Sequence, residues 1–235
     1  MENLRSVLVD SFRMMVNRPV LFVPRLVSTS FSSVVFILLA MGEISQQVFL
    51  LSFPVILLLG GFVPVIVSAM VKIEGENILR NSIKESLKLW KQVVGLIGLI
   101  FFISLINSIP ISLGMAGYII TQNIIYPVIG GIISLVILIA VTFGLYFVPI
   151  SIVKRQDLFG SLKEGFNTSR QNSKEVMILT LFSLAIFIIS ALLESGNPQN
   201  IGFALFFIGR ITSAIVATYL LVISPQYYLS QGEEK

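Results

Sequence analysis

Six apolar stretches, each long enough to cross a bilayer, constrain this sequence more than any other feature. A membrane-spanning helix needs about 20 mainly apolar residues. Only 12% of the 235 residues are charged, about half the share found in soluble domains, which excludes a soluble or disordered chain. The sequence therefore predicts an all-α, polytopic membrane protein with one membrane domain over 1–235. The predicted spans are 20–41, 48–71, 93–113, 126–153, 176–193 and 201–223.

Basic residues divide the segments between these spans into two classes. One class holds 14 Lys and Arg residues, and the other holds none. The basic class comprises 1–19, 72–92, 154–175 and 224–235, and the other comprises 42–47, 114–125 and 194–200. Loops rich in Lys and Arg stay cytoplasmic, so both termini are expected there, in a multi-pass protein of the cell membrane. We expect the basic face to contact anionic lipid headgroups, and we expect no nucleic-acid partner.

Three parts of the chain resemble one another without gaps, at offsets of 75 and 79 residues. Apolar spans match by composition alone, so the shared acids, amides and glycines carry the comparison. The sequence predicts three parallel pseudo-repeats over about 4–73, 79–153 and 158–228, which favours a pseudo-threefold bundle. The shared columns include Leu8, Ile83 and Leu162; Asp10, Glu85 and Glu164; Phe12, Leu87 and Phe166; Asn17, Gln92 and Gln171; and Gly42, Gly117 and Gly196.

Each predicted unit begins with an amphipathic segment and continues as an outward span, a short outer loop and a return span. In the second unit Leu79, Ile83 and Leu87 share one helical stripe, while Lys84 and Lys88 lie on another side. This pattern predicts three cytoplasmic amphipathic helices that lie in the membrane interface. Plain cytoplasmic linkers are the alternative, and the basic residues could also contact a protein partner.

Glycines and prolines predict where the spans end. We expect the glycine column Gly42, Gly117 and Gly196 to close the outward spans as left-handed caps. Each return span carries a proline near its cytoplasmic end, which should bend or stop the helix there. These prolines are Pro64, Pro149 and Pro225.

The chemistry available to the chain is narrow. The sequence has no Cys and no His, which excludes disulfides, thiolate nucleophiles, the usual zinc sites and histidine general bases. No predicted span carries an acid near its centre, as a carboxylate proton relay would need. We therefore expect no catalytic, cofactor-binding or metal-binding residues, although a membrane enzyme of unusual chemistry remains open.

Arg210 is the sharpest single candidate for a ligand contact. It lies nine residues into the last predicted span, about 13 Å deep at 1.5 Å per residue. An arginine at that depth costs about 2.5–3.5 kcal/mol on insertion scales, so it should face protein or water. One interpretation is a contact with an anion or a lipid phosphate. The other is an internal structural brace or a snorkelling side chain.

Hydroxyl residues form a second candidate feature. Thr29, Ser104 and Ser183 share a column of the three repeats, and all lie near the middle of their spans. In a pseudo-threefold bundle they could form a ring around the axis, near Arg210. The alternative is ordinary packing of small residues, with hydroxyls bonding within or between helices.

The opening stretch SFRMMVNRPVLFVP and the later SIKESLKLWK and SLKEGFNTSR segments resemble a broad family of prokaryotic six-helix membrane proteins. That family is similar to the membrane domain preceding some glycerophosphodiester phosphodiesterases. The resemblance covers nearly the whole chain and implies a membrane module without the phosphodiesterase activity. It supplies no catalytic residues.

These observations favour a non-enzymatic membrane module that organises lipid or a partner protein, for example as an accessory subunit or a homo-oligomer. The alternative is a transporter or channel for a small or anionic solute or a lipid, whose path follows the pseudo-threefold axis past Arg210.

Overall fold

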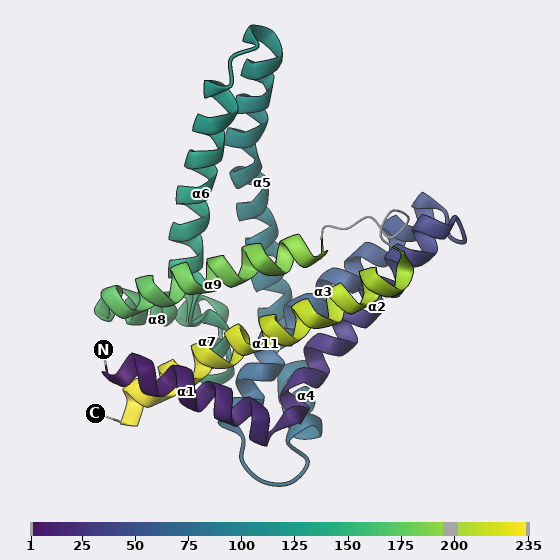
Figure 1. The fold of residues 1–235 in the computed structure, drawn as a ribbon. Coiled ribbons are helices and arrows are strands. Elements are labelled where there is room, and N and C mark those ends of the chain that lie inside the picture. The colour runs from purple at the N-terminus through teal and green to yellow at the C-terminus, as the bar shows by residue number, and fades with distance from the viewer. Residues whose placement is uncertain (1, 195–201, 234–235) are drawn as a thin grey trace.

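The computed structural model of the protein describes residues 2–194 and 202–233, and every regular element within them is a helix (Figure 1). The elements are α1 (Glu2–Asn17), a 3-10 helix (Pro19–Phe22), α2 (Val23–Met41), α3 (Gln46–Lys72), α4 (Ile78–Lys88), α5 (Trp90–Thr121), α6 (Ile125–Leu145), α7 (Val148–Arg155), α8 (Leu158–Gln171), α9 (Ser173–Glu194) and α11 (Phe203–Glu233).

Six of the helical segments are long and apolar enough to cross a bilayer, which confirms the predicted number. The chain is thus a multi-pass, all-helical membrane protein. The fourth segment consists of α6 and α7 together. The third and sixth segments run further than predicted, because α5 continues to Thr121 and α11 continues to Glu233.

The expected proline stops occur at one of three positions. Pro149 lies in the first turn of α7, just after the helix breaks at Tyr146 and Phe147. Pro64 and Pro225 lie inside α3 and α11, which continue past them, so the prediction that each proline bends or stops its helix fails there as to a stop. Neighbouring helices and side chains can satisfy the backbone groups that a proline frees, so a packed membrane helix can continue past one.

The expected glycine caps also differ between the units. Gly42 ends α2 in the left-handed conformation, with φ +77°. Gly117 lies inside α5, which ends instead at Gln122 with φ +57°, so the expected cap at Gly117 is wrong. Its helix is free to continue because the next polar residues come only at 121–123. Gly196 lies outside the described residues.

The helices pair as three antiparallel hairpins, α2 with α3, α5 with α6, and α9 with α11. The return helices α3, α7 and α11 contact one another, and each outward helix also contacts the return helix of another hairpin. The α5–α6 hairpin contacts mainly itself and rises away from the other two (Figure 1). The hairpins therefore meet at one end and separate toward the other.

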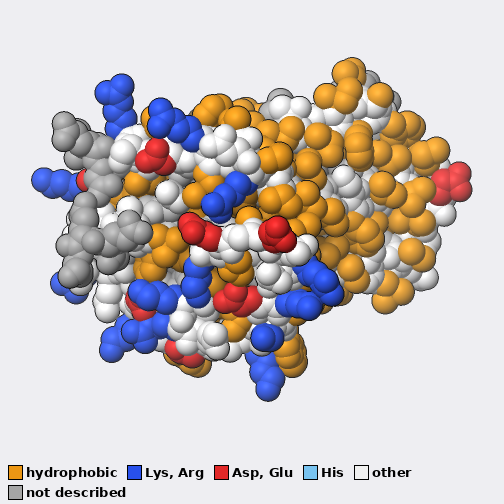
Figure 2. All heavy atoms as spheres, turned by 90° about the horizontal axis from the view of Figure 1, so that it is seen from below, with side chains coloured by type: hydrophobic (Ala, Val, Ile, Leu, Met, Phe, Trp, Pro, Cys, Tyr) orange, Lys and Arg blue, Asp and Glu red, His pale blue; other side chains and the backbone are white. Residues whose placement is uncertain are grey.

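The packed core lies where the hairpins meet. Its buried side chains come from the last turns of α3, from α7 and from the last turns of α11, together with α1 and the start of α5. Examples are Val65, Leu89, Phe147 and Ile223. Charged side chains gather over this end, whereas hydrophobic side chains cover the part of the molecule on the right of the view, where α2, α3 and α11 extend from it (Figure 2). Most of the apolar side chains on the long helices are exposed on the protein surface, as expected of helices that contact lipid.

Candidate ligand site between the hairpins

Arg210 on α11 binds two serines of α2. Its Nε donates to Ser33 Oγ at 2.7 Å, and its Nη2 donates to Ser32 Oγ at 3.0 Å. Both serine hydroxyls donate in turn to the carbonyl oxygen of Thr29, at 2.7 and 3.0 Å. The guanidinium thus joins α2 to α11 through hydroxyls whose own protons are already engaged.

Two aromatic rings lie beside the same guanidinium. Its central carbon is 5.5 Å from the ring centroid of Phe36 and 5.6 Å from that of Phe206. A cation within about 6 Å of an aromatic centroid is attracted by the ring quadrupole, most strongly where water is excluded. Arg210 therefore occupies a site that stabilises its charge, as an internal brace between two helices requires.

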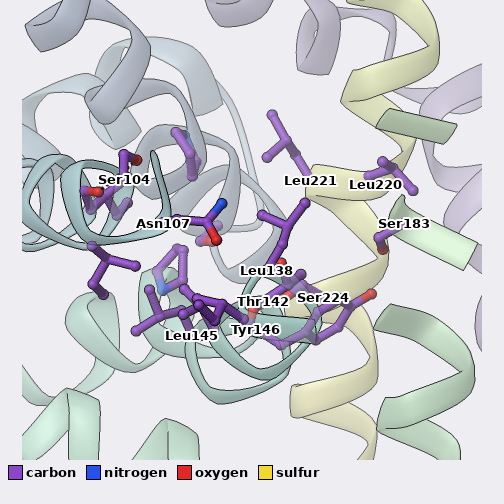
Figure 3. Close-up of a pocket in the computed structure, with 17 residues that line it drawn as sticks. Ser104, Asn107, Leu138, Thr142, Leu145, Tyr146, Ser183, Leu220, Leu221 and Ser224 are labelled. Atoms are coloured by element: carbon purple, nitrogen blue, oxygen red, sulfur yellow. Dashed lines mark hydrogen bonds between the residues drawn. The ribbon is translucent and has the colours of Figure 1, made fainter. Parts of the chain in front are cut away.

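A separate cavity of about 370 Å³ lies where the three hairpins diverge (Figure 3). Residues of α3, α5, α6, α7, α9 and α11 line it, so all three hairpins contribute. Its wall is mainly apolar, from side chains such as Leu138, Leu145 and Leu220. The residues that line it in the described part of the chain are uncharged, and its polar members are Ser68, Ser104, Asn107, Thr142, Tyr146, Ser183 and Ser224.

Two of the four candidate residues from the sequence line this cavity. Ser104 on α5 and Ser183 on α9 both contribute to its wall. Thr29 is buried on α2 beneath the serines that bind Arg210, and neither Thr29 nor Arg210 lines the cavity. The structure therefore places the hydroxyl column in two locations, one in the cavity and one in the Arg210 brace.

Several polar groups of the cavity are already hydrogen-bonded. Ser104 Oγ donates to the Ile100 carbonyl oxygen at 2.8 Å, and Ser224 Oγ donates to the Tyr146 carbonyl oxygen at 2.6 Å. The second of these bonds satisfies a backbone carbonyl at the break between α6 and α7. These hydroxyls therefore have their donors engaged and can only accept from a ligand.

Two other hydroxyls in the cavity wall have no such bond. Tyr146 Oη and Ser183 Oγ are shielded from solvent, and among the described residues neither makes a hydrogen bond of good geometry. They lie near enough to each other for a weak mutual hydrogen bond, and Figure 3 shows both at the edge of the same cavity. A buried polar group without a partner costs about 1–3 kcal/mol. A ligand oxygen placed between them would recover part of that cost.

The sequence signal for Tyr146 was available but weak. Tyr146 is a single phenol in a long apolar run, just before the Phe147–Val148–Pro149 break. A proline at a helix start frees carbonyls in the preceding turn, so the polar groups next to it are candidates for an internal site. Asn107 and Ser224 also line the cavity without having been candidates, because single polar residues in spans most often serve helix packing.

The cavity offers groups that can bind a ligand. Among the described residues its lining provides hydroxyls and one amide. An apolar cavity with a few polar groups holds an amphiphilic ligand in one orientation. No protein-family model, curated protein or solved structure matches this chain, so its function must be argued from these residues.

Proposed function

We propose that the chain is a non-enzymatic membrane module that organises lipid, with the apolar part of a lipid held in the cavity between the hairpins. The cavity carries this proposal, because apolar walls surround two shielded hydroxyls, Tyr146 Oη and Ser183 Oγ, that make no hydrogen bond of good geometry among the described residues. An ester or ether oxygen of a lipid would accept from those hydroxyls while its chain fills the apolar part. Such a module fits the resemblance to the membrane domain that precedes some glycerophosphodiester phosphodiesterases.

We further propose that the module consists of three parallel pseudo-repeats. Residues at equivalent positions of the three predicted repeats have similar solvent exposure, which supports this proposal. Phe12, Leu87 and Phe166 are 60%, 56% and 51% exposed, whereas the residues that precede them, Ser11, Ser86 and Gly165, are all buried. Two amphipathic helices also pair their equivalent acids with the end of the preceding return helix, Glu85 with Lys72 and Glu164 with Lys154 and Arg155.

The helix contacts also support a pseudo-threefold arrangement. The amphipathic helices α4 and α8 pack on the return helices that precede them, α3 and α7. In the same way α1 packs on α11, the return helix of the last unit. The contact pattern thus closes in a ring, as three equivalent units around one axis would require.

We propose that α1, α4 and α8 lie in the cytoplasmic membrane interface. In α4 the small residues Ser82 and Ser86 are buried in the protein, while Ile83, Leu87 and the adjacent Trp90 are exposed. An exposed apolar stripe beside exposed lysines fits a helix at the boundary between lipid and water. Exposed tryptophans favour the headgroup level.

Cysteine accessibility tests the proposed topology. The chain has no cysteine, so each introduced thiol is the only one present. In intact cells a membrane-impermeant maleimide should label Glu43→Cys, in the outer loop, but should label Glu74→Cys only after permeabilisation. Both residues are exposed loop acids, which makes them matched controls for each other. The reverse pattern would contradict cytoplasmic termini.

Filling the cavity tests lipid binding. Leu138→Trp places an indole in the cavity wall, whereas Leu135→Trp, one turn away on α6, points to the surface, where Leu135 is 47% exposed. We expect native mass spectrometry of the Leu138→Trp protein to detect at least tenfold less retained phosphatidylcholine than the wild type, and the Leu135→Trp protein to retain a normal amount. Equal retention by the two variants would contradict the proposal.

Transport is the second candidate, and the position of the cavity between all three hairpins favours it. A transport path would then run past Ser104 and Ser183, while Arg210 binds Ser32 and Ser33 away from it. Purified protein in liposomes should move neither lipid nor small anions if it is a lipid-organising module. If the protein does carry a flux, and Leu138→Trp blocks it while Leu135→Trp leaves it intact, the chain is a transporter and not a lipid-organising module.

A further inference from the structure

A second hollow of about 470 Å³ lies at the charged end of the protein, apart from the central cavity. It is enclosed by four parts of the chain: the residue after α3, one face of α4, the first turn of α5, and the turn between α7 and α8. Its lining residues are Ile73, Asn81, Lys84, Glu85, Lys88, Leu89, Gln92 and Gln156. Unlike the central cavity, its lining is mainly polar.

The charges of this hollow do not cancel. Glu85 pairs with Lys72, the last residue of α3, at 3.8 Å. Lys84 and Lys88 lie four residues apart on α4, so they project from the same side of the helix. Within the described residues neither of these two lysines forms an ion pair. The hollow therefore presents two ammonium groups that pair with no carboxylate of the described residues.

Gln92 adds a directed acceptor to these two cations. Its Nε2 donates to the Gln156 carbonyl oxygen at 2.6 Å, which fixes the orientation of the amide. The opposite atom, Oε1, is shielded from solvent and has no hydrogen-bond partner in the described chain. A shielded carbonyl oxygen without a donor is unfavourable. The hollow thus combines two cations for an anion with one acceptor that needs a hydroxyl or amine.

In the interfacial position that we propose for α4, the hollow lies at the level of lipid headgroups. Ile83 and Leu87 form an exposed apolar stripe on a different side of α4 from Lys84 and Lys88, and the exposed Trp90 follows at the start of α5. A helix with this distribution lies with its apolar side in lipid and its cations among the headgroups. A phosphate at the membrane surface can therefore reach both lysines.

We propose that this hollow binds a phosphate group that carries a neighbouring hydroxyl, as in a polyol phosphate. The phosphate oxygens accept from Lys84 and Lys88, and the hydroxyl donates to Gln92 Oε1. Two sources offer this chemistry: the headgroup of an anionic phospholipid such as phosphatidylglycerol, and a soluble polyol phosphate. This assignment is independent of lipid binding in the central cavity.

Matched double substitutions test the proposal with the full-length protein. Lys84→Gln with Lys88→Gln removes the two cations of the hollow. Arg80→Gln with Lys91→Gln removes the same charge from exposed residues that do not line it. In phosphatidylcholine nanodiscs doped with phosphatidylglycerol, we expect the first pair to bind phosphatidylglycerol about tenfold more weakly than the second, which corresponds to about 1.4 kcal/mol. Equal weakening would mean surface attraction alone and would overturn the site.

Two further experiments test the contact between the ligand hydroxyl and Gln92 and identify the source of the ligand. Gln92→Met should abolish a preference for phosphatidylglycerol over phosphatidic acid, which lacks the extra hydroxyl. A preference that persists in this variant would overturn the role of Oε1. Calorimetry with glycerol 3-phosphate in neutral detergent tests the soluble source. The site is supported if phosphatidylglycerol or glycerol 3-phosphate binds, and if Lys84→Gln with Lys88→Gln abolishes that binding while Arg80→Gln with Lys91→Gln does not. The compound that binds identifies the source of the ligand.

The same variants separate this site from the central cavity. Leu138→Trp should bind phosphatidylglycerol at the hollow normally, because Leu138 does not line it. Thermal unfolding midpoints of the two double variants should agree within a few degrees, since all four substituted side chains are exposed. Weak binding by a variant that unfolds normally is then an effect on the site and not on folding.

Discussion

Gly130→Ala should separate α6 from α5 and lower the free energy of unfolding by about 2–3 kcal/mol, at the upper end of the usual cost of overpacking. A Cβ at position 130 would lie 2.3 Å from the Pro110 carbonyl oxygen and 3.1 Å from its carbon. Both are backbone atoms, so no side-chain rotation relieves the overlap and the helices must move apart. The outer part of the α5–α6 hairpin rises away from the other helices (Figure 1), so little else there would hold its two helices at the native separation.

The neighbouring residue supplies the control. A Cβ at Gly131 would meet no atom within 4 Å, so Gly131→Ala should leave stability unchanged or raise it slightly through better helix propensity. Gly114→Ala should resemble Gly130→Ala, because its Cβ would lie 2.7 Å from the Tyr126 carbonyl oxygen. Equilibrium unfolding in mixed micelles measures all three variants. Equal effects at positions 130 and 131 would contradict the close approach of α5 and α6.

A disulfide reporter measures the same separation directly. Asn107 Oδ1 accepts from Ser134 Oγ at 3.1 Å across the two helices, and the chain has no other cysteine to compete. Asn107→Cys with Ser134→Cys should cross-link readily in the otherwise native protein and much more slowly when Gly130→Ala is added. Addition of Gly131→Ala should leave the cross-linking rate unchanged.

Ser32→Ala combined with Ser33→Ala should destabilise the protein by about 2 kcal/mol, because the two substitutions remove both serine partners of the Arg210 guanidinium. Hydrogen bonds to charged groups contribute about 1.5–3 kcal/mol each in soluble proteins. Interhelical bonds in membranes average about 0.6 kcal/mol with a maximum of about 1.7. Because these two bonds join helices within the membrane, we take the membrane value for each of them. Two such charge-assisted bonds, each between the average and the maximum, give the expected loss of about 2 kcal/mol.

A double-mutant cycle isolates the role of the charge. In the Arg210→Leu background the same two serine substitutions should cost far less, because each hydroxyl then only bonds back to Thr29 within α2. Ser30→Ala, on the same helix, serves as the control. Equal costs in the two backgrounds would mean that Arg210 does not depend on these serines. Loss of a measured flux in Arg210→Leu protein that remains fully stable would restore the transport role of Arg210.

Much of the fold follows from local properties of the chain. The number of spans is confirmed because each needs only a length of apolar sequence to satisfy its backbone within a bilayer. The break at Pro149 followed from the same local reasoning, but the continuous helices through Pro64 and Pro225 did not. Whether a helix continues past a proline depends on which neighbours satisfy the freed carbonyl, and a single segment does not contain that information.

The candidate site was predicted only in part for the same reason. The repeat column identified Ser104 and Ser183, which line the cavity, and Thr29, which lies in the Arg210 brace. Depth within a span is readable from position along the chain. Whether a residue faces a cavity or a neighbouring helix depends on how far α5 and α6 lean away from the other hairpins. The column of equivalent residues in the repeats contains no information about that tilt.

By itself the sequence determined the absence of cysteine and histidine chemistry, the membrane class and the number of helices long enough to cross a bilayer. The last two depend on the transfer of single segments between water and lipid. Only the tertiary structure decided that Arg210 joins two helices, that a cavity opens between three hairpins and that Lys84, Lys88 and Gln92 share one hollow. Lipid and protein interiors are similarly apolar, so hydropathy does not choose which helices touch; close packing and individual hydrogen bonds do.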